Sequence, residues 1–145
     1  FCCGVVNCRD LPVKFFNAPA GNGEKVSLIY DAPHCGNLPN LGMRSVRTTN
    51  EDDKSGVRTI KIDDLNLPSC KFMKIDCEGS EIPTLFGARD TIKRCRPVLF
   101  VEMFPSGLGW RNFTPRFLED TLRSMGYNLE QIGPNERFDW FCTPI

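Results

Sequence analysis

The chain has 145 residues, and its 18 Lys and Arg residues balance its 18 Asp and Glu residues, so its formal net charge is zero. A chain of this length is expected to form one domain with a buried core. The neutral balance argues against a nucleic-acid-binding protein, and no apolar run is long enough to span a membrane. No charged segment followed by an apolar one opens the chain, so no secretory signal is expected.

The eight cysteines form no C-x-x-C pair, and His34 is the only histidine, which argues against a zinc site. An even number of cysteines permits disulfides. Several of them, however, lie in strand-like or helix-end contexts, where a free cysteine packs as a small apolar side chain. We therefore expect reduced, buried thiols and an intracellular, reducing compartment, either the cytoplasm or an organelle matrix, and not a disulfide framework. His34 lies in a loop and is expected to be solvated.

The first part of the chain is predicted to be a series of extended segments joined by turns. Gly21-Asn22-Gly23 comes just before a run of β-forming residues and is typical of a hairpin turn. Prolines, glycines and asparagines in residues 31–42 indicate a surface loop, and the charged residues 51–56 indicate a solvated linker. The predicted extended segments cover residues 1–6, 13–16, 25–30, 44–49 and 57–62.

A strand over residues 72–76 is predicted to end at Asp76, followed by a tight turn that contains Glu78 and Gly79. The next helix begins at Ser80 or Glu81. Ser80 is a suitable N-cap, because its hydroxyl can accept a hydrogen bond from a free backbone N–H. Glu81 lies in the first turn, where the helix dipole favours a negative charge. This arrangement places carboxylates at the carboxyl end of a strand.

This helix is predicted to continue to Arg96, because Pro97 stops it. Gly87 lies inside it at a cost of about 1 kcal/mol relative to Ala, which indicates a close approach to a neighbouring strand. The apolar residues at helical spacing, expected to form one buried stripe, are Ile82, Leu85, Phe86 and Ile92.

Residues 98–103 form a short apolar run bounded by prolines, which is typical of a parallel strand buried on both faces. Strand, helix and strand together make a βαβ unit with a right-handed crossover. Asp76 and Glu102 would then lie at the same edge of adjacent parallel strands. Ligands bind beyond the carboxyl ends of such strands, so both acids are candidates for chemistry. The alternative is structural: Asp76 could cap the next helix, and Glu102 could pair with an arginine.

The last third of the chain begins with a predicted loop over residues 104–113. Its aromatic side chains could line a substrate pocket or simply plug the edge of the sheet. Thr114 and Pro115 then begin a helix as cap and first residue, and Gly126 ends it. Segments 127–132 and 137–142 flank a turn and predict a closing antiparallel hairpin. The helix's apolar stripe is expected to contain Phe117, Leu118, Leu122 and Met125.

Four blocks of the sequence, in this order and at these distances, resemble the FkbM-type methyltransferases, which depend on S-adenosylmethionine. The match is clear from about residue 57 to residue 103, with Cys77 at a position where the family has an aliphatic residue. The blocks are residues 59–65, 74–81, 85–88 and 96–102.

The resemblance implies an α/β fold, a Rossmann-like methyltransferase sheet within a single, partial FkbM-like domain over residues 1–145. It implies an enzyme that transfers a methyl group from S-adenosylmethionine to a hydroxyl of a sugar or another small molecule. Carried onto this sequence, the catalytic residues are Asp76, Glu102 and Glu78. The cofactor-binding residues are Asp76, Gly4 and Val5, and no metal is implied.

The family opens with a strand and a glycine-rich loop for the cofactor, and neither is visible in this sequence. The N-terminal glycine-rich half is therefore expected to be lacking, and the chain alone is expected to bind S-adenosylmethionine weakly or not at all. An open sheet edge is normally covered, so another chain could cover it. The alternative function is a non-catalytic methyltransferase-like subunit with a structural or interaction role in a larger assembly.

Overall fold

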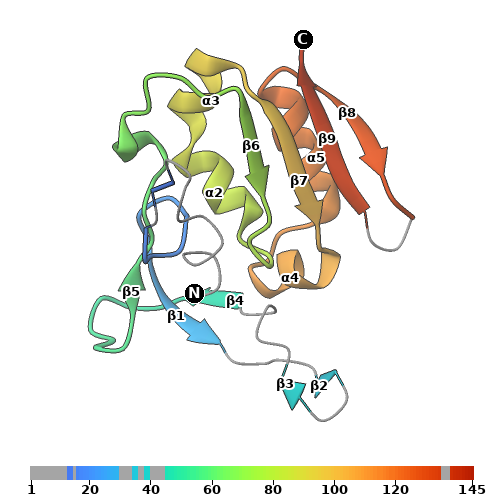
Figure 1. The fold of residues 1–145 in the computed structure, drawn as a ribbon. Coiled ribbons are helices and arrows are strands. Elements are labelled where there is room, and N and C mark those ends of the chain that lie inside the picture. Colours follow the sequence, from blue (N-terminus) through green and yellow to red (C-terminus); the bar gives the residue numbers. More distant parts are fainter. Residues whose placement is uncertain (1–12, 15, 30–33, 36–37, 40–44, 135–137) are drawn as a thin grey trace.

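The structure, a computed structural model, describes residues 13–14, 16–29, 34–35, 38–39, 45–134 and 138–145. The predicted strand over residues 1–6 lies outside these residues, and residues 13, 14 and 16 are not in a strand. The elements, labelled in Figure 1, are β1 (Lys25–Ile29), β2 (His34–Cys35), β3 (Leu38–Pro39), β4 (Ser45–Thr48), β5 (Val57–Arg58), the 3₁₀ helix η1 (Asp63–Leu65), β6 (Phe72–Ile75), α2 (Glu81–Gly87), α3 (Arg89–Cys95), β7 (Val98–Met103), α4 (Pro105–Trp110), α5 (Pro115–Ser124), β8 (Tyr127–Ile132) and β9 (Phe138–Pro144).

The main sheet has four strands in the order β6-β7-β9-β8. Strands β6 and β7 are parallel, with Phe72 opposite Val98, so the predicted pair of adjacent parallel strands is confirmed. Strand β9 is antiparallel to both β7 and β8, which confirms the predicted closing hairpin. The fold is therefore a mixed α/β arrangement in which β6 and β7 end at the same edge of the sheet.

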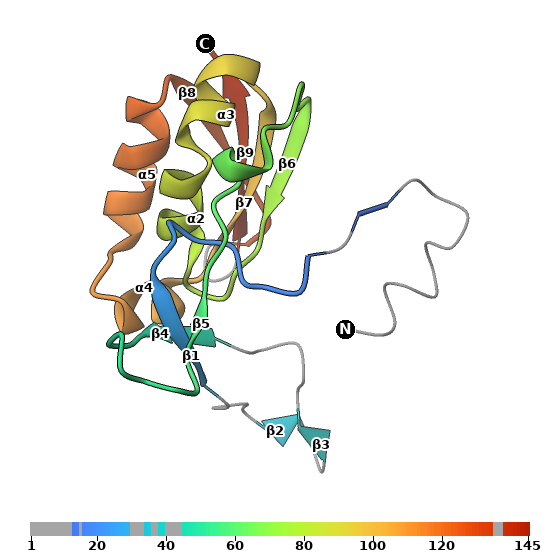
Figure 2. The same ribbon diagram turned by 90° about the vertical axis from the view of Figure 1, so that its left-hand side faces the viewer.

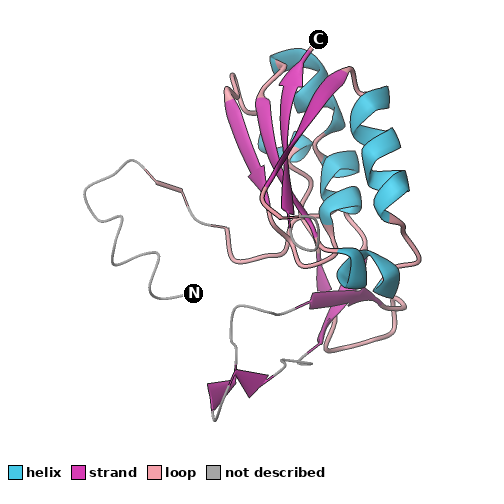
Figure 3. Cartoon of the chain, turned by 90° about the vertical axis from the view of Figure 1, so that its right-hand side faces the viewer, coloured by secondary structure: helices cyan, strands magenta, loops and turns pink. Residues whose placement is uncertain are grey.

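The helices α2, α3 and α5 cover one face of this sheet, as the side views in Figures 2 and 3 show. The core between them contains Leu99 and Val101 of β7 together with Leu85, Ile92 and Leu122 of the helices, all at most 1% exposed. Side chains alternate between the two faces of a strand, and in β7 buried residues alternate with half-buried ones. The prediction that this strand is buried on both faces is therefore wrong for the described residues, among which no helix covers the second face.

The single helix predicted from Ser80 to Arg96 is two helices, α2 and α3, separated at Ala88. The break coincides with a close backbone contact at Gly87, where an added Cβ would lie 1.9 Å from the carbonyl oxygen of Gly21. The predicted close approach at Gly87 is thus confirmed, but its partner is a loop and not a strand. Only glycine allows this approach, so the loop before β1 can pack directly on the helical layer.

Two aromatic side chains predicted to lie in buried helical stripes are instead partly exposed. Phe86 on α2 is 42% exposed and Phe117 on α5 is 44% exposed, whereas Leu85 and Leu118 beside them are fully buried. Helix α5 otherwise begins as predicted: the Thr114 hydroxyl accepts a hydrogen bond from the Phe117 N–H at 3.1 Å. Gly126 follows the helix with φ of +81°.

A second sheet, in the order β4-β1-β5, is antiparallel and lies beyond the carboxyl ends of β6 and β7 (Figure 1). The predicted strands over residues 25–30 and 44–49 are confirmed as β1 and β4. The strand predicted over residues 57–62 is shorter: β5 contains only Val57 and Arg58, and Ile60 forms an isolated parallel bridge with Ala20. Gly21-Asn22-Gly23 lies between this bridge and β1, where it forms a bend and not the predicted hairpin turn.

Candidate functional site

Three carboxylates meet at the carboxyl ends of the parallel strands. Asp76 follows β6, Glu78 lies in the turn after it, and Glu102 is near the end of β7. One carboxylate oxygen from each lies within 4.8 Å of the other two. Asp76 is exposed, and Glu78 and Glu102 are half-buried. The structure thus brings together all three residues that the sequence predicted to be catalytic.

The turn after Asp76 has a left-handed backbone at two successive residues, with φ of +49° at Glu78 and +94° at Gly79. It packs against α4, where an added Cβ on Gly79 would lie 2.4 Å from the carbonyl of Gly107. The loop predicted over residues 104–113 thus contains the helix α4. Gly107 in this helix allows the backbone of the turn to approach the backbone of the helix. This contact holds the turn that contains Glu78 against α4.

Glu81 has a larger structural role than its predicted interaction with the helix dipole. Its side chain is fully buried, and its Oε1 accepts hydrogen bonds from the N–H groups of Cys77 at 3.0 Å and Gly79 at 3.1 Å. Ser80 is the N-cap residue, but its side chain makes no capping bond. The carboxylate of Glu81 therefore satisfies the N–H groups of the turn.

Within the acidic cluster, the surroundings of Glu102 change its proton affinity. Burial, and next the charges of Asp76 and Glu78, raise the pKa of Glu102 to about 7. One oxygen of Glu102, Oε2, is buried and has no hydrogen-bond partner among the described residues. Lys74 forms an ion pair with Asp76, and this bond raises the pKa of Lys74. Near neutral pH, Glu102 can therefore take up or release a proton while Lys74 partly balances the charge of Asp76.

This arrangement can perform two kinds of chemistry. A carboxylate with a pKa near the working pH is suited to general acid–base catalysis. Three convergent carboxylates also match the oxygen ligands that Mg²⁺ and Ca²⁺ prefer, although the sequence predicted no metal. A cavity of about 290 Å³ lies beside the cluster and is lined by Glu102, Met103, Phe138 and Asp139. Asp76 and Glu78 are not among its lining residues.

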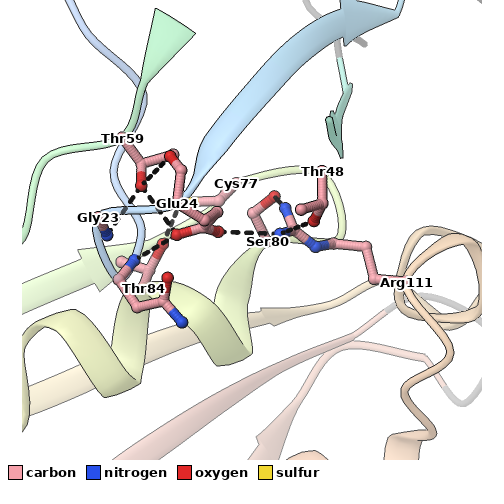
Figure 4. A network of polar contacts seen from close by, with 9 residues as sticks. Gly23, Glu24, Thr48, Thr59, Cys77, Ser80, Thr84 and Arg111 are labelled. Atoms are coloured by element: carbon pink, nitrogen blue, oxygen red, sulfur yellow. Dashed lines mark hydrogen bonds and ion pairs between the residues drawn. The ribbon is translucent and has the colours of Figure 1, made fainter. Parts of the chain in front are cut away.

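A polar network, shown in Figure 4, connects the turn to the second sheet. The guanidinium of Arg111, just after α4, donates to the Ser80 hydroxyl at 2.9 Å and to the Thr48 hydroxyl at 3.2 Å. It also pairs with Glu24 at 2.9 Å, and the two side chains are only 9% and 15% exposed. Glu24 in turn accepts a hydrogen bond from the Thr59 hydroxyl at 2.8 Å. The sequence does not predict this network, because its members lie up to 87 residues apart.

Asp63 has a structural role at the start of α3. Its carboxylate accepts hydrogen bonds from the N–H groups of Asp90 at 3.0 Å and Thr91 at 2.8 Å, and so caps the start of α3. This acid belongs to the first sequence block shared with the methyltransferases. The structure places it on the helical layer and not in the acidic cluster.

Of the predicted cofactor-binding residues, the structure describes only Asp76; Gly4 and Val5 lie outside the described residues. Four of the described cysteines are free thiols: Cys70, Cys77, Cys95 and Cys142. Burial raises the pKa of Cys77 to about 11 and that of Cys142 to about 12. These two thiols are therefore protonated at neutral pH and unsuited to act as nucleophiles.

The fold and the site together define a class of protein, namely a mixed α/β domain with carboxylates at the ends of parallel strands. Residues 2–129 match the family described as the methyltransferase FkbM domain. The chain therefore belongs to the FkbM methyltransferase family, which confirms the resemblance noted in the sequence. A search of curated proteins found no match to the chain.

The fold is also similar to a solved structure, the crystal structure of methyltransferase FkbM from Methylobacillus flagellatus KT. The sequence identity is 16% and the TM-score is 0.57. The similarity covers 97% of this chain and 32% of that chain. Within the described residues, no helix is both long and apolar enough to cross a membrane.

Proposed function

We propose that the acidic cluster is the site at which this domain supports S-adenosylmethionine-dependent O-methylation of a sugar or another hydroxylated small molecule. Membership of the FkbM family supports methyl transfer and favours an enzyme over the non-catalytic alternative. The main observation is the meeting of Asp76, Glu78 and Glu102 at the edge of two parallel strands. In Rossmann-like sheets, to which we assign this one, ligands bind at that edge.

The donor set fits the cofactor in charge and in hydrogen-bonding type. Bound S-adenosylmethionine supplies a methyl group on a positively charged sulfur, together with ribose hydroxyls. The carboxylates of Asp76 and Glu78 are negatively charged and can accept hydrogen bonds from hydroxyls. Since Asp76 is the most exposed of the three acids, it is our candidate for cofactor contact.

Glu102 is our candidate for the general base. In the transfer, the acceptor oxygen bonds to the methyl carbon, the bond from methyl to sulfur breaks, and the hydroxyl proton passes to a carboxylate oxygen. The Oε2 of Glu102 is buried and has no hydrogen-bond partner in the part of the chain that the structure describes, and the pKa of Glu102 is raised to about 7. The cavity beside it, lined also by Phe138 and Asp139, offers room for part of an acceptor.

The test uses a form of the protein that transfers methyl groups, with radiolabelled S-adenosylmethionine and a panel of sugars and other hydroxylated small molecules. Removing a general base costs about 10²- to 10⁴-fold in rate, so Glu102→Gln and Asp76→Asn should each lower turnover within or near this range. Glu130→Gln is the control, because Glu130 is an exposed acid of the same sheet on β8. Full turnover of both site variants with only a lower melting temperature would show that the acids are structural.

A chelator separates the two chemistries open to the cluster. If Glu102 is the base, methyl transfer should be the same with and without EDTA. Loss of activity with EDTA and its recovery with Mg²⁺ would assign the carboxylates to a cation instead.

Cofactor binding by the 145-residue chain alone is a separate part of the proposal. Gly107 and Gly109 lie within α4, so within the described residues they do not form a glycine-rich loop after a strand. We expect the chain alone to bind S-adenosylmethionine more weakly than about 1 μM, which corresponds to about −8.2 kcal/mol. Calorimetric titration measures this, and micromolar binding would show that other residues hold the cofactor.

A further inference from the structure

The pair α2–α3 and helix α5 lie side by side on one face of the main sheet (Figure 2). A groove is lined by residues of these three helices and by the residues that follow α3 and α5. Its volume is about 600 Å³, which lies within the usual range for small-molecule sites. The floor contains Ile92, at 1% exposure, and Thr121, at 8% exposure. None of its lining residues belongs to the acidic cluster.

The walls of the groove are the two aromatic side chains that the helical stripes leave exposed. Phe86 on α2 and Phe117 on α5 are 42% and 44% exposed, and both line the groove. The ring of Phe117 is held by stacking on Phe113, with centroids 5.6 Å apart and planes 7° apart. Covering two such rings would remove apolar surface from water, which is favourable. The groove is therefore suited to an apolar body.

The rim of the groove carries spare positive charge. Arg89 and Lys93 are four residues apart on α3, so they lie on the same side of the helix. Both are exposed, and neither forms an ion pair with any residue that the structure describes. On the opposite wall, Asp120 is already paired with Arg116 at 3.2 Å.

The other polar groups of the groove are occupied. Arg96 donates to the carbonyl oxygens of Met125 at 2.7 Å and Gly126 at 2.6 Å. The Thr121 and Ser124 hydroxyls donate to backbone carbonyls at 2.7 Å each. Two cations, Arg89 and Lys93, are thus left to bind a ligand.

We propose that this groove binds a small molecule with one anionic head, a carboxylate or a phosphate monoester, on an apolar tail or ring. The apolar part lies between Phe86 and Phe117, and the head pairs with Arg89 and Lys93. A guanidinium offers parallel N–H groups to the oxygens of such a head. A cationic or neutral head gains nothing from these two side chains. The site is independent of the methyl-transfer proposal, because it shares no residue with the acidic cluster.

The test titrates the 145-residue chain with octanoate, octyl phosphate and octylammonium, followed by calorimetry and by NMR of the backbone amides. The two anions should bind saturably with a Kd of about 1 mM or tighter for ligands of this size. Octylammonium should bind about tenfold more weakly, because two exposed charges oppose it. A stronger response to octyl phosphate than to octanoate would identify the phosphate as the preferred head. The amide shifts should be confined to α2, α3 and α5.

Two variants and their matched controls assign the effect to the groove. The double variant Arg89→Glu, Lys93→Glu should remove or invert the preference for anions, and Phe86→Ser should weaken binding of both anions. Neither variant replaces a buried side chain, so the fold should be retained. The control for charge is Lys54→Glu, Arg123→Glu, at exposed cations outside the groove. The control for apolar surface is Phe72→Ser, since Phe72 is 56% exposed on the main sheet.

Three results would overturn the proposal. The first is the absence of saturable binding of either anion up to about 10 mM, well above the affinity expected for ligands of this size. The second is equal binding of octylammonium, or loss of binding in Phe72→Ser, which would show nonspecific adhesion to apolar surface. The third is a concentration-dependent dimer that Phe86→Ser abolishes, because the groove would then be occupied by a second copy of the chain.

Discussion

Asp76 follows β6 and Glu102 lies near the end of the parallel strand β7, and their carboxylate oxygens lie within 4.8 Å of each other and of a carboxylate oxygen of Glu78. Two like charges at this separation repel each other, and burial adds to the cost for Glu102. One proton, or a bound cation, relieves the repulsion. The protonation state of Glu102 therefore connects the stability of the protein to its proposed activity.

The first prediction concerns stability and pH. The folded-state pKa of Glu102 is raised from 4.5 to about 7, with burial as its first cause. The folded state thus binds more protons than the unfolded state between these values, so stability should fall as pH rises from about 4.5 through about 7. Glu102→Gln cannot ionise, so it should raise the melting temperature at pH 8 more than at pH 5. Thermal denaturation across this range, with Glu130→Gln as control, measures the difference, and an equal shift at both pH values would contradict it.

The second prediction concerns Glu81, whose role is larger than an interaction with the helix dipole. Because its buried Oε1 accepts from two backbone N–H groups, Glu81→Ala should lower the free energy of unfolding by about 1–3 kcal/mol. Glu81→Gln keeps a carbonyl oxygen as acceptor and should cost less. Urea denaturation of both variants tests this, and a loss well below 1 kcal/mol in Glu81→Ala would mean that the carboxylate does not support the turn.

The third prediction concerns the ion pair between Arg111 and Glu24. Both side chains are nearly buried, so Arg111→Met would leave Glu24 as an unpaired buried charge. Breaking such a pair costs about 3–5 kcal/mol. The double variant Arg111→Met, Glu24→Gln should recover part of this loss, because no unpaired charge remains. Denaturant unfolding of Arg111→Met, Glu24→Gln and the double variant gives the coupling free energy between the two side chains. Purely additive losses would show that the pair is not coupled.

The fourth prediction compares two glycines, Gly79 and Gly109, that have different surroundings. Gly79 has φ of +94° and its added Cβ would collide with the Gly107 carbonyl, so Gly79→Ala should cost at least about 1–3 kcal/mol in stability. Around Gly109, in α4, an added Cβ meets nothing within 4 Å. Gly109→Ala should therefore be neutral or stabilise the helix by about 0.5–1 kcal/mol. Melting temperatures compare the two, and a tolerated Gly79→Ala would disprove the backbone contact.

The elements with strong local signals could be predicted from the sequence. The parallel pair β6 and β7, helix α5 with its Thr114 cap, and the hairpin of β8 and β9 follow from apolar patterning, proline and glycine. Asp76, Glu78 and Glu102 could be predicted to meet because parallel strands end at a common edge. These features depend on short stretches of chain, so the sequence is sufficient for them.

Other features depend on distant contacts and could not be predicted. The break at Ala88 coincides with the packing of Gly21 on Gly87, and α4 contains two glycines that locally favour a loop. The spacing of apolar residues also did not predict the exposure of Phe86 and Phe117, because helical spacing does not show where the covered face of a helix ends. Glu81 was assigned to the helix dipole because its burial and its bonds to the turn arise only in the folded structure.

The composition of the core has a consequence for how the chain unfolds. Its buried cluster runs from Ile75 to Cys142 in sequence. Among the described residues before β6, the one partly buried apolar side chain that packs against it is Ile62. The second sheet joins this block through hydrogen bonds and one ion pair around Arg111. Segments with few buried apolar contacts open at lower free energy than the core. The amides of β1 and β4 should therefore exchange with solvent well before those of β7 and β9, so that the second sheet detaches while the four-stranded sheet stays folded.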